Sequence, residues 1–473
     1  MKKEPKVTFL DGNMGVSPTS GVSLRNTYIA AVSAFTYITV MGLVIGYASS
    51  ATVDMKKPGS RFQDVTADQI SWIVSLPSLS GVIGNFLSGY FIQKLGRKAV
   101  LMFISGTYMV SWLTIVYANS VAFLYVGRLI AGFSCGMATV AVSAYVVEIA
   151  PTKIRGFLSS GFQVLYSVGV LIIMSLGVVL RWSWLALSAA VFVAISACMM
   201  LAMPESPVWL IRESRNLEAA YSLKFLRGMN ADIAKEAQDI KENMTKDTAG
   251  GVTWRELSKP TLYKPLIIVF FLFFFGQLSG MAALISYTVD IFEKAGGIVD
   301  ARVSAAVVAI VQLIATIMCS ILIDRTGRKF LYIISGIFIF ISLSCLAIYT
   351  VMLQKYDFDL DNYKWLPLLS FVVYIAAYSC GFGPIPFVMA PEFVPIHSRG
   401  VVLAVGTITC SLVAFIVAKT FDSVREEIGD YGMYFMYAIS SLIGSIFCYL
   451  FVQETKGRSI RDINKSFEYK NNY

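Results

Sequence analysis

The sequence predicts an all-α membrane protein with twelve transmembrane helices arranged as two six-helix repeats, and three observations lead to this fold class. First, 56% of the residues are hydrophobic and 15% are charged, whereas a soluble protein carries about 25% charged residues. Second, apolar residues come in runs of about 20 or more, which as helices cross a hydrocarbon core of about 30 Å. Third, matching motifs recur in the two halves of the chain.

The expected spans follow one another as apolar runs separated by polar connections. In the first half the runs cover residues 28–50, 70–92, 99–118, 121–147, 157–180 and 183–203. In the second half they cover residues 265–289, 303–323, 330–353, 365–389, 400–421 and 432–452. The tenth span contains "CGFGPIP". We expect its glycines and prolines to break the helix, because irregular backbone at that depth is tolerated where it lines a cavity.

A polar, charged stretch divides these spans into six and six. The expected parts are a tail at 1–27, a six-helix bundle at 28–203, a central loop at 204–264, a second bundle at 265–452 and a tail at 453–473. Lys and Arg concentrate in the tails, the central loop and alternate short connections. By the positive-inside rule, we expect both tails and the central loop in the cytoplasm of a multi-pass plasma membrane protein.

Several classes of function are excluded by composition. The seven cysteines all fall within apolar runs and form no Cys-x-x-Cys pair, and His397 is the one histidine. Metal sites, a bound cofactor and a nucleophile–base set for an enzyme therefore find no support. The net charge of +9 reflects which loops lie on the inner side of the membrane, so it does not indicate a nucleic-acid partner.

Three pairs of motifs argue for a duplicated six-helix unit. "LGRK" at 95–98 matches "TGRK" at 326–329, and "EIAPTKIRG" at 148–156 matches "PEFVPIHSRG" at 391–400. "PESP" at 204–207 follows the sixth span as "QETKGR" at 453–458 follows the twelfth. Two such bundles, related by an axis along the membrane normal, can rock about a central site and expose it to each side in turn.

These motifs resemble those of the sugar porter family of the major facilitator superfamily. The residues that carry the resemblance also include "GRLIAGFSCGMATVAVSAYVVEIAPTKIRG", "PESPVWL", "QLSG", "DRTGRK" and "GFGPIPF", in the family's order, over nearly all of residues 28–460. Within the family the chain looks most like facilitated trehalose transporters and their hexose-transporter relatives. The resemblance implies the major facilitator fold and a small neutral sugar as substrate.

The resemblance also implies a cytoplasmic gate built from charged residues at matched places. Its expected members are Arg97, Glu148, Arg155, Asp324, Arg328, Glu392 and Arg399, and Glu205 and Glu454 join the network by the same resemblance. Gln93 stands where relatives carry an acidic residue, so the gate of the first half should be weaker. The alternative is that these arginines only obey the orientation rule.

For the substrate site, the resemblance points to amide and aromatic residues within the spans. The candidates are Gln163, Gln277, Gln312, Tyr378, Gly383 and Phe387. Amides both donate to and accept from sugar hydroxyls, and aromatic faces suit the apolar faces of a sugar ring. The alternative for each glutamine is a helix–helix hydrogen bond, which contributes about 0.6–2 kcal/mol.

Departures from the family pattern bear on the substrate and on energy coupling. Gly276, Ala282, Ser379 and Cys410 stand where relatives often carry polar partners, so the sugar itself is left open. Proton-coupled relatives carry a carboxylate in the first span, where this chain has Ala48. We therefore expect uncoupled facilitation; a proton symporter, a carrier of a polyol-like solute and a non-transporting sugar sensor stay as alternatives.

Overall fold

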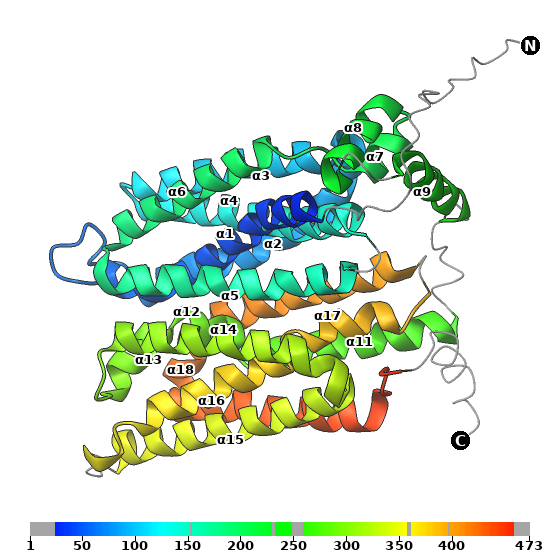
Figure 1. Ribbon diagram of the computed structural model, residues 1–473. Helices are drawn as coiled ribbons and strands as arrows, with labels where there is room; N and C mark the ends of the chain where they lie inside the picture. The colour runs from blue at the N-terminus through cyan, green and yellow to red at the C-terminus, as the bar shows by residue number, and fades with distance from the viewer. Residues whose placement is uncertain are drawn as a thin grey trace, which may run out of the picture.

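The computed structural model describes residues 24–151, 154–228, 232–247, 259–356, 361–395 and 398–457, and these are helical almost throughout (Figure 1). The helices of the first half are α1 (Arg25–Met55), α2 (Ala67–Leu95), α3 (Arg97–Val116), α4 (Val121–Ile149), α5 (Arg155–Val179) and α6 (Trp182–Leu201). Between the halves lie α7 (Pro207–Arg212), α8 (Asn216–Arg227) and α9 (Ile233–Asp247). The second half contains α11 (Pro260–Leu278), α12 (Met281–Ser286), α13 (Thr288–Ala295), α14 (Ala301–Thr326), α15 (Arg328–Lys355), η1 (Asp361–Tyr363), α16 (Leu366–Cys380), α17 (Ile385–Glu392) and α18 (Arg399–Phe451).

Eleven described helical stretches are long and apolar enough to cross a membrane. The difference from the expected twelve lies in α18, which runs for 53 residues through a non-helical Gly429 with φ 77° and ψ 166°. A straight helix of that length would measure about 80 Å, far more than the hydrocarbon core. Two of the predicted spans, 400–421 and 432–452, lie within it on either side of Gly429, so the twelve-helix fold class is confirmed.

The helices form two bundles that lie side by side in Figure 1, with α1–α6 in one and α11–α18 in the other. Within the first bundle α1 packs on α5, α2 on α4 and α3 on α6. Within the second, α15 packs on α16 and α18, and α11 packs on α18. The bundles meet chiefly through α2 against α18 and α5 against α14.

Two spans of the second bundle are interrupted, each at a glycine. The first interruption follows α11, which ends at Leu278. Gly280 there has φ 89°, a left-handed conformation that residues with a side chain rarely adopt. An added Cβ there would also meet the ring of Tyr437. The predicted break in "CGFGPIP" is present, since α16 ends at Cys380 and α17 begins at Ile385.

Close backbone contact holds α2 against α4. Gly132 and Gly136 form a Gly-x-x-x-Gly pair on α4, and Gly81 and Gly84 face them from α2. A Cβ at Gly136 would overlap the carbonyl oxygen of Gly81, and one at Gly84 would overlap that of Phe133. Because lipid tails are as apolar as side chains, small residues that let backbones approach are what drives helix association in membranes.

A buried arginine compensates for a proline in the same bundle. Pro77 lies inside α2 and has no N–H to donate to the carbonyl four residues earlier, at Ile73. Arg128 of α4, 1% exposed, donates from Nε to the Ile73 carbonyl at 2.9 Å and from Nη1 to the Val44 carbonyl of α1 at 2.7 Å. Arg128 therefore bridges α1, α2 and α4.

The short helices α7, α8 and α9 cover one end of the first bundle, which we call the capped end. Asn26 and Thr27 at the start of α1 donate to the carbonyls of Phe225 and Leu226 in α8. Arg227, 4% exposed, donates to Thr27 Oγ1, to the Ile149 carbonyl and to Glu236 of α9. These contacts fasten the cap to the first bundle.

Candidate functional site

At the same end of the molecule as the cap, a glutamate contacts the start of a helix in each bundle, and we call each such contact a joint. Gly96 and Gly327 precede α3 and α15 with φ of 97° and 99°. A carboxylate occupies the space that a Cβ would take: Glu205 beside Gly96 and Glu454 beside Gly327. The glycines thus let a carboxylate approach the helix N-terminus, where negative charge is stabilised.

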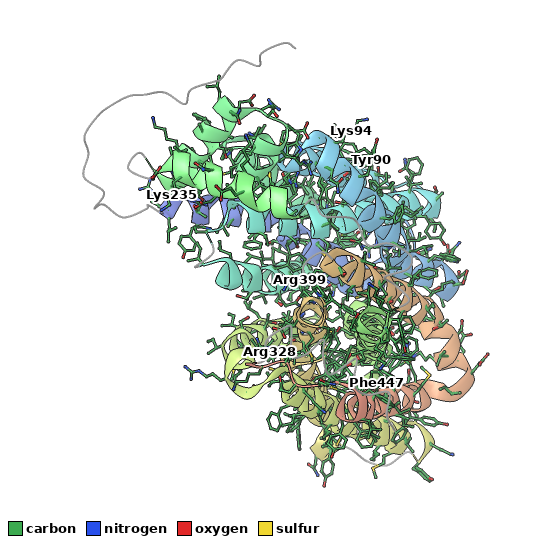
Figure 2. The ribbon with its side chains drawn as sticks, turned by 90° about the vertical axis from the view of Figure 1, so that its right-hand side faces the viewer. Tyr90, Lys94, Lys235, Arg328, Arg399 and Phe447 are labelled. Atoms are coloured by element: carbon green, nitrogen blue, oxygen red, sulfur yellow. The ribbon has the colours of Figure 1, made fainter. Side chains whose placement is uncertain are left out.

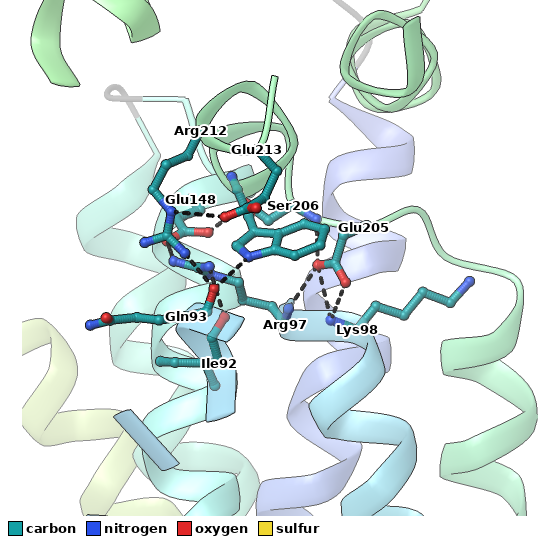
Figure 3. A network of polar contacts seen from close by, with 10 residues as sticks. Ile92, Gln93, Arg97, Lys98, Glu148, Glu205, Ser206, Arg212 and Glu213 are labelled. Atoms are coloured by element: carbon teal, nitrogen blue, oxygen red, sulfur yellow. Dashed lines mark hydrogen bonds and ion pairs between the residues drawn. The ribbon is translucent and has the colours of Figure 1, made fainter. Parts of the chain in front are cut away.

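Backbone hydrogen bonds fix each carboxylate in its joint. Glu205 Oε1 accepts from the N–H groups of Arg97 and Lys98 at 2.9 and 3.0 Å (Figure 3). Glu454 accepts from those of Arg328 and Lys329 at 3.0 and 3.1 Å. Each joint ties the end of the last span of its bundle to the start of the third, which explains the paired "PESP" and "QETKGR" motifs.

An arginine–glutamate pair adjoins each joint. Arg97 Nη2 lies 2.7 Å from Glu148 Oε1, whose other oxygen accepts from Ser206 Oγ at 2.5 Å. In the second bundle Arg328 Nη2 lies 3.3 Å from Glu392 Oε1. Both pairs connect helices within one bundle. The structure thus brings together four of the seven predicted gate residues as two equivalent pairs.

Of the other three predicted gate residues, one has a described side chain. The side chains of Arg155 and Asp324 lie outside the described residues. Arg399 is half-buried, and its Nε has no hydrogen-bond partner among the described residues. Figure 2 looks onto the capped end and shows Arg399 nearer the middle of the molecule than Arg328.

Two of the candidate substrate residues, Gln277 and Tyr378, are hydrogen-bonded to each other in the second bundle. Gln277 Nε2 donates to Tyr378 Oη at 3.3 Å and to Cys410 Sγ at 3.1 Å, which joins α11, α16 and α18. Gly383, in the break after α16, packs its backbone on Tyr378, where its N–H donates to the Tyr378 carbonyl at 2.9 Å. A side chain at Gly383 would therefore displace this tyrosine.

Phe387 contacts α11 at Phe273, one turn before Gln277. It is 39% exposed and packs edge-on against Phe273 of α11, with ring centroids 4.7 Å apart. Tyr166 of α5 lies close enough to Tyr378 and Cys410 for electrostatic interaction, which brings a hydroxyl of the first bundle to the same region. The amide, the two phenols and the exposed ring carry no charge, and the amide and phenols can donate and accept hydrogen bonds.

Gln163 and Gln312 occupy different environments. Gln163 of α5 is half-buried, whereas Gln312 of α14 is 2% exposed and its Oε1 has no hydrogen-bond partner among the described residues. An unsatisfied buried amide oxygen is costly and calls for a donor. Neither glutamine makes a side-chain hydrogen bond to the Gln277 cluster.

Sequence reasoning missed one contact in this cluster. The residue type at 410 predicts a lost hydrogen-bond partner, whereas the Cys410 sulfur accepts a hydrogen bond from the Gln277 amide. A thiol sulfur is a weak acceptor, so the amide is held less firmly than an oxygen would hold it.

The chain is similar to known proteins over nearly its full length. Residues 27–467 match the family described as "Sugar (and other) transporter". A protein of Culex quinquefasciatus named "Facilitated trehalose transporter Tret1" is 35% identical over 92% of this chain and 85% of the relative. One of the same name from Apis mellifera ligustica is 35% identical over 91% of this chain and 86% of the relative. A longer relative from Anopheles gambiae is 34% identical, and the chain spans 56% of it.

Solved structures match the fold. One titled "Inward open conformation of the xylose transporter XylE from E. coli" superposes with a TM-score of 0.78 at 21% identity, over 93% of this chain and 99% of that chain. A second, titled as a major facilitator superfamily proton:xylose symporter bound to 6-bromo-6-deoxy-D-glucose, gives 0.72 at 21% identity, over 94% and 99%. At this identity the likeness concerns the fold, which is the one predicted.

Proposed function

Because the chain belongs to the sugar transporter family, we propose that it is a facilitative carrier of trehalose or of a hexose such as glucose, working by alternating access. Family membership makes it a multi-pass membrane transporter of a sugar and not an enzyme. The names of its relatives support trehalose. The choice between the disaccharide and a hexose is the part that the experiment below decides.

The observation that carries the proposal is the Gln277 cluster. A neutral sugar is bound by groups that donate and accept without charge, and Gln277, Tyr378 and Cys410 form such a set within the second bundle. The exposed ring of Phe387 offers an apolar face. We propose that Gln163 and Gln312 complete the site when sugar is bound. Neither amide is hydrogen-bonded to the Gln277 cluster, so both can bond to the sugar.

The absence of proton coupling is supported by the residues around α1. Ala48 is fully buried where a coupling carboxylate would stand, and a proton relay needs a titratable group in the path. Arg128, the buried cation nearby, uses Nε and Nη1 for two backbone carbonyls. We therefore propose that sugar moves only down its own gradient.

The positive-inside rule supports the orientation. We propose that the capped end, with both chain termini, faces the cytoplasm. We propose that the Arg97–Glu148 and Arg328–Glu392 pairs and the half-buried Arg399 hold in place the helix ends that border the cytoplasmic gate. Because each pair lies within one bundle, we propose that the two bundles move past each other with these pairs intact.

Uptake of labelled trehalose, glucose and a polyol into transport-null cells, with and without a proton gradient, tests this function. We expect saturable uptake of one sugar that a gradient does not raise above equilibrium. Gln277→Ala should lower kcat/KM about tenfold, since a hydrogen bond to a substrate hydroxyl contributes about 1.4 kcal/mol. Gln238→Ala, on the exposed face of α9, is the matched control.

Three results would contradict parts of the proposal. Gradient-driven accumulation would overturn uncoupled facilitation. Unchanged kinetics of Gln277→Ala would mean that this glutamine only forms a helix–helix hydrogen bond. Lack of uptake of every solute, despite normal amounts of chain at the cell surface, would favour the sensor.

A further inference from the structure

Opposite the capped end, a buried ion pair joins the two bundles. Arg302, in the first turn of α14, places Nη2 2.9 Å from Asp54 Oδ1 at the end of α1. The side chains are 14% and 10% exposed. Arg302 Nη1 also donates to the Gly177 carbonyl at 3.2 Å, and Asp54 Oδ2 accepts from the Trp182 N–H at 3.0 Å. One cation thus bridges α14 to the ends of α1 and α5.

A second ion pair joins the bundles at the other contact between them. Lys419 of α18 pairs with Asp68, in the first turn of α2, and donates to Ser71 Oγ at 2.8 Å. Its Nζ lies 4.6 Å from the centroid of the Trp72 ring, a cation–π arrangement. The Asp68 side chain is 74% exposed, so water weakens this pair relative to the first.

The two pairs differ from the other charged contacts of the molecule. Among ion pairs between described side chains they are the two that connect one bundle with the other. They belong to different helix contacts, α14 with α1 and α5, and α18 with α2. A third contact joins the bundles: Ser49 Oγ of α1, fully buried, accepts from the Val289 N–H of α13 at 3.2 Å.

We propose that Asp54–Arg302 and Asp68–Lys419 form a two-part latch, here called the interface latch, which holds the bundles together at the uncapped end. This inference rests on the proposed alternating-access function, in which the uncapped end opens once in each cycle. The four residues are positioning residues, since they set which side the site faces. The latch opens by separating both pairs, and each charge then has to be hydrated.

The arrangement indicates unequal shares for the two parts. Arg302 makes a second bond to the first bundle, from Nη1 to the Gly177 carbonyl, while the Trp182 N–H holds Asp54 in place within that bundle. Loss of Arg302 would leave the Asp54 carboxylate, whose side chain is 10% exposed, with the 53% exposed Lys57 of its own bundle as its remaining ion-pair partner among the described side chains. Weaker pairing of a buried charge favours hydration and therefore separation. Loss of Lys419 leaves an exposed carboxylate that water already solvates. Arg302 variants should accordingly shift the equilibrium further than Lys419 variants.

Accessibility of a buried thiol measures opening without reference to transport. Ser49→Cys places the thiol in the buried contact between α1 and α13 of the two bundles. An impermeant methanethiosulfonate reagent added to intact cells reports its exposure. The parent chain, with its seven native cysteines, gives the background. We expect Arg302→Gln to raise the labelling rate about tenfold, as expected for a lost hydrogen bond between charged groups. Lys419→Gln should raise the labelling rate by a smaller factor. Arg302→Lys, which keeps the charge, should restore much of the protection.

Arg61→Gln is the matched control. Arg61 lies at the same end but bonds only within the first bundle, to the Ala118 carbonyl and Asn119, so its loss should leave labelling unchanged. If Arg302→Gln does not reach the surface, the exposed pair is tested alone with Lys419→Gln and Asp68→Asn.

Unchanged labelling in every variant that reaches the surface, or an equal rise in Arg61→Gln, would overturn the latch. Uptake by the parent chain is scored separately. Labelling that responds in a chain without uptake would keep the latch and refute the carrier. Normal uptake with unresponsive labelling would keep the carrier and refute the latch.

Discussion

The bridge between Arg128 and the carbonyl that Pro77 leaves free makes a prediction about two positions at once. In Arg128→Leu the Ile73 carbonyl loses its donor and, because residue 77 is proline, has no helical N–H to replace it. In the double variant Pro77→Ala/Arg128→Leu, the new N–H of residue 77 satisfies that carbonyl. The second substitution should therefore rescue the first.

The magnitude follows from the contacts. A buried carbonyl without a donor costs about 1–3 kcal/mol, and the lost cation–π contact with Tyr47, 5.9 Å from the Arg128 guanidinium, adds about 0.5–2 kcal/mol. Removing a buried cation offsets part of this loss. We expect Arg128→Leu to lower the free energy of unfolding by about 2 kcal/mol. Pro77→Ala should stabilise the Arg128→Leu background by about 1 kcal/mol more than it stabilises the native background.

Equilibrium unfolding of the four chains in mixed micelles, arranged as a double-mutant cycle, measures this coupling. Pro265→Ala is the control, since Pro265 lies in α11 of the other bundle and its effect should be the same in the native and the Arg128→Leu backgrounds. Additive effects of Pro77→Ala and Arg128→Leu, within about 0.3 kcal/mol, would refute the idea that the arginine substitutes for the missing N–H.

Two further outcomes are expected. Gly136→Leu should separate α2 from α4 and abolish a monodisperse peak in size-exclusion chromatography, whereas Gly106→Leu, with open space around the added Cβ, should not; equal profiles would contradict the backbone contact. Burial raises the pKa of Asp290, but the hydrogen bond from Arg425 and the charges of Lys294 and Arg425 outweigh it, so the pKa lies below its ordinary value. Such a carboxylate contributes fully above about pH 4 and loses its contribution as the pH falls through the lowered pKa. Asp290→Asn should therefore lower the unfolding midpoint at about pH 7 and flatten its decline towards about pH 3; an unchanged decline would contradict this.

Span positions and the repeat could be predicted because their signals are local. Apolar runs report burial in lipid or protein, and "LGRK" and "TGRK" report the glycine that a carboxylate needs beside a helix start. The interruption after Cys380 was predictable from its glycines and prolines. The interruption at Gly280 was not, because the strained conformation depends on the Tyr437 ring from a distant helix.

Contacts between the bundles could not be predicted in the same way. Asp54 and Arg302 are 248 positions apart, and Asp68 and Lys419 are 351 apart. None of the four belongs to a motif, and each reads locally as an ordinary charge near a span end. The Gln277 amide was predicted as part of the site, but its Cys410 partner looked like a lost contact because sequence comparison records residue types, not distances.

The glycine contacts between helices also bear on how natural variants of this chain should be interpreted. At Gly89, Gly106 and Gly156 nothing lies within 4 Å of an added Cβ, so alanine there is expected to be harmless. At Gly84 and Gly169 the added carbon would overlap a neighbouring backbone carbonyl, which cannot move aside as a flexible side chain can. The same glycine-to-alanine substitution would therefore be tolerated at one position and disabling at another, and its severity follows from the distance to the neighbouring helix.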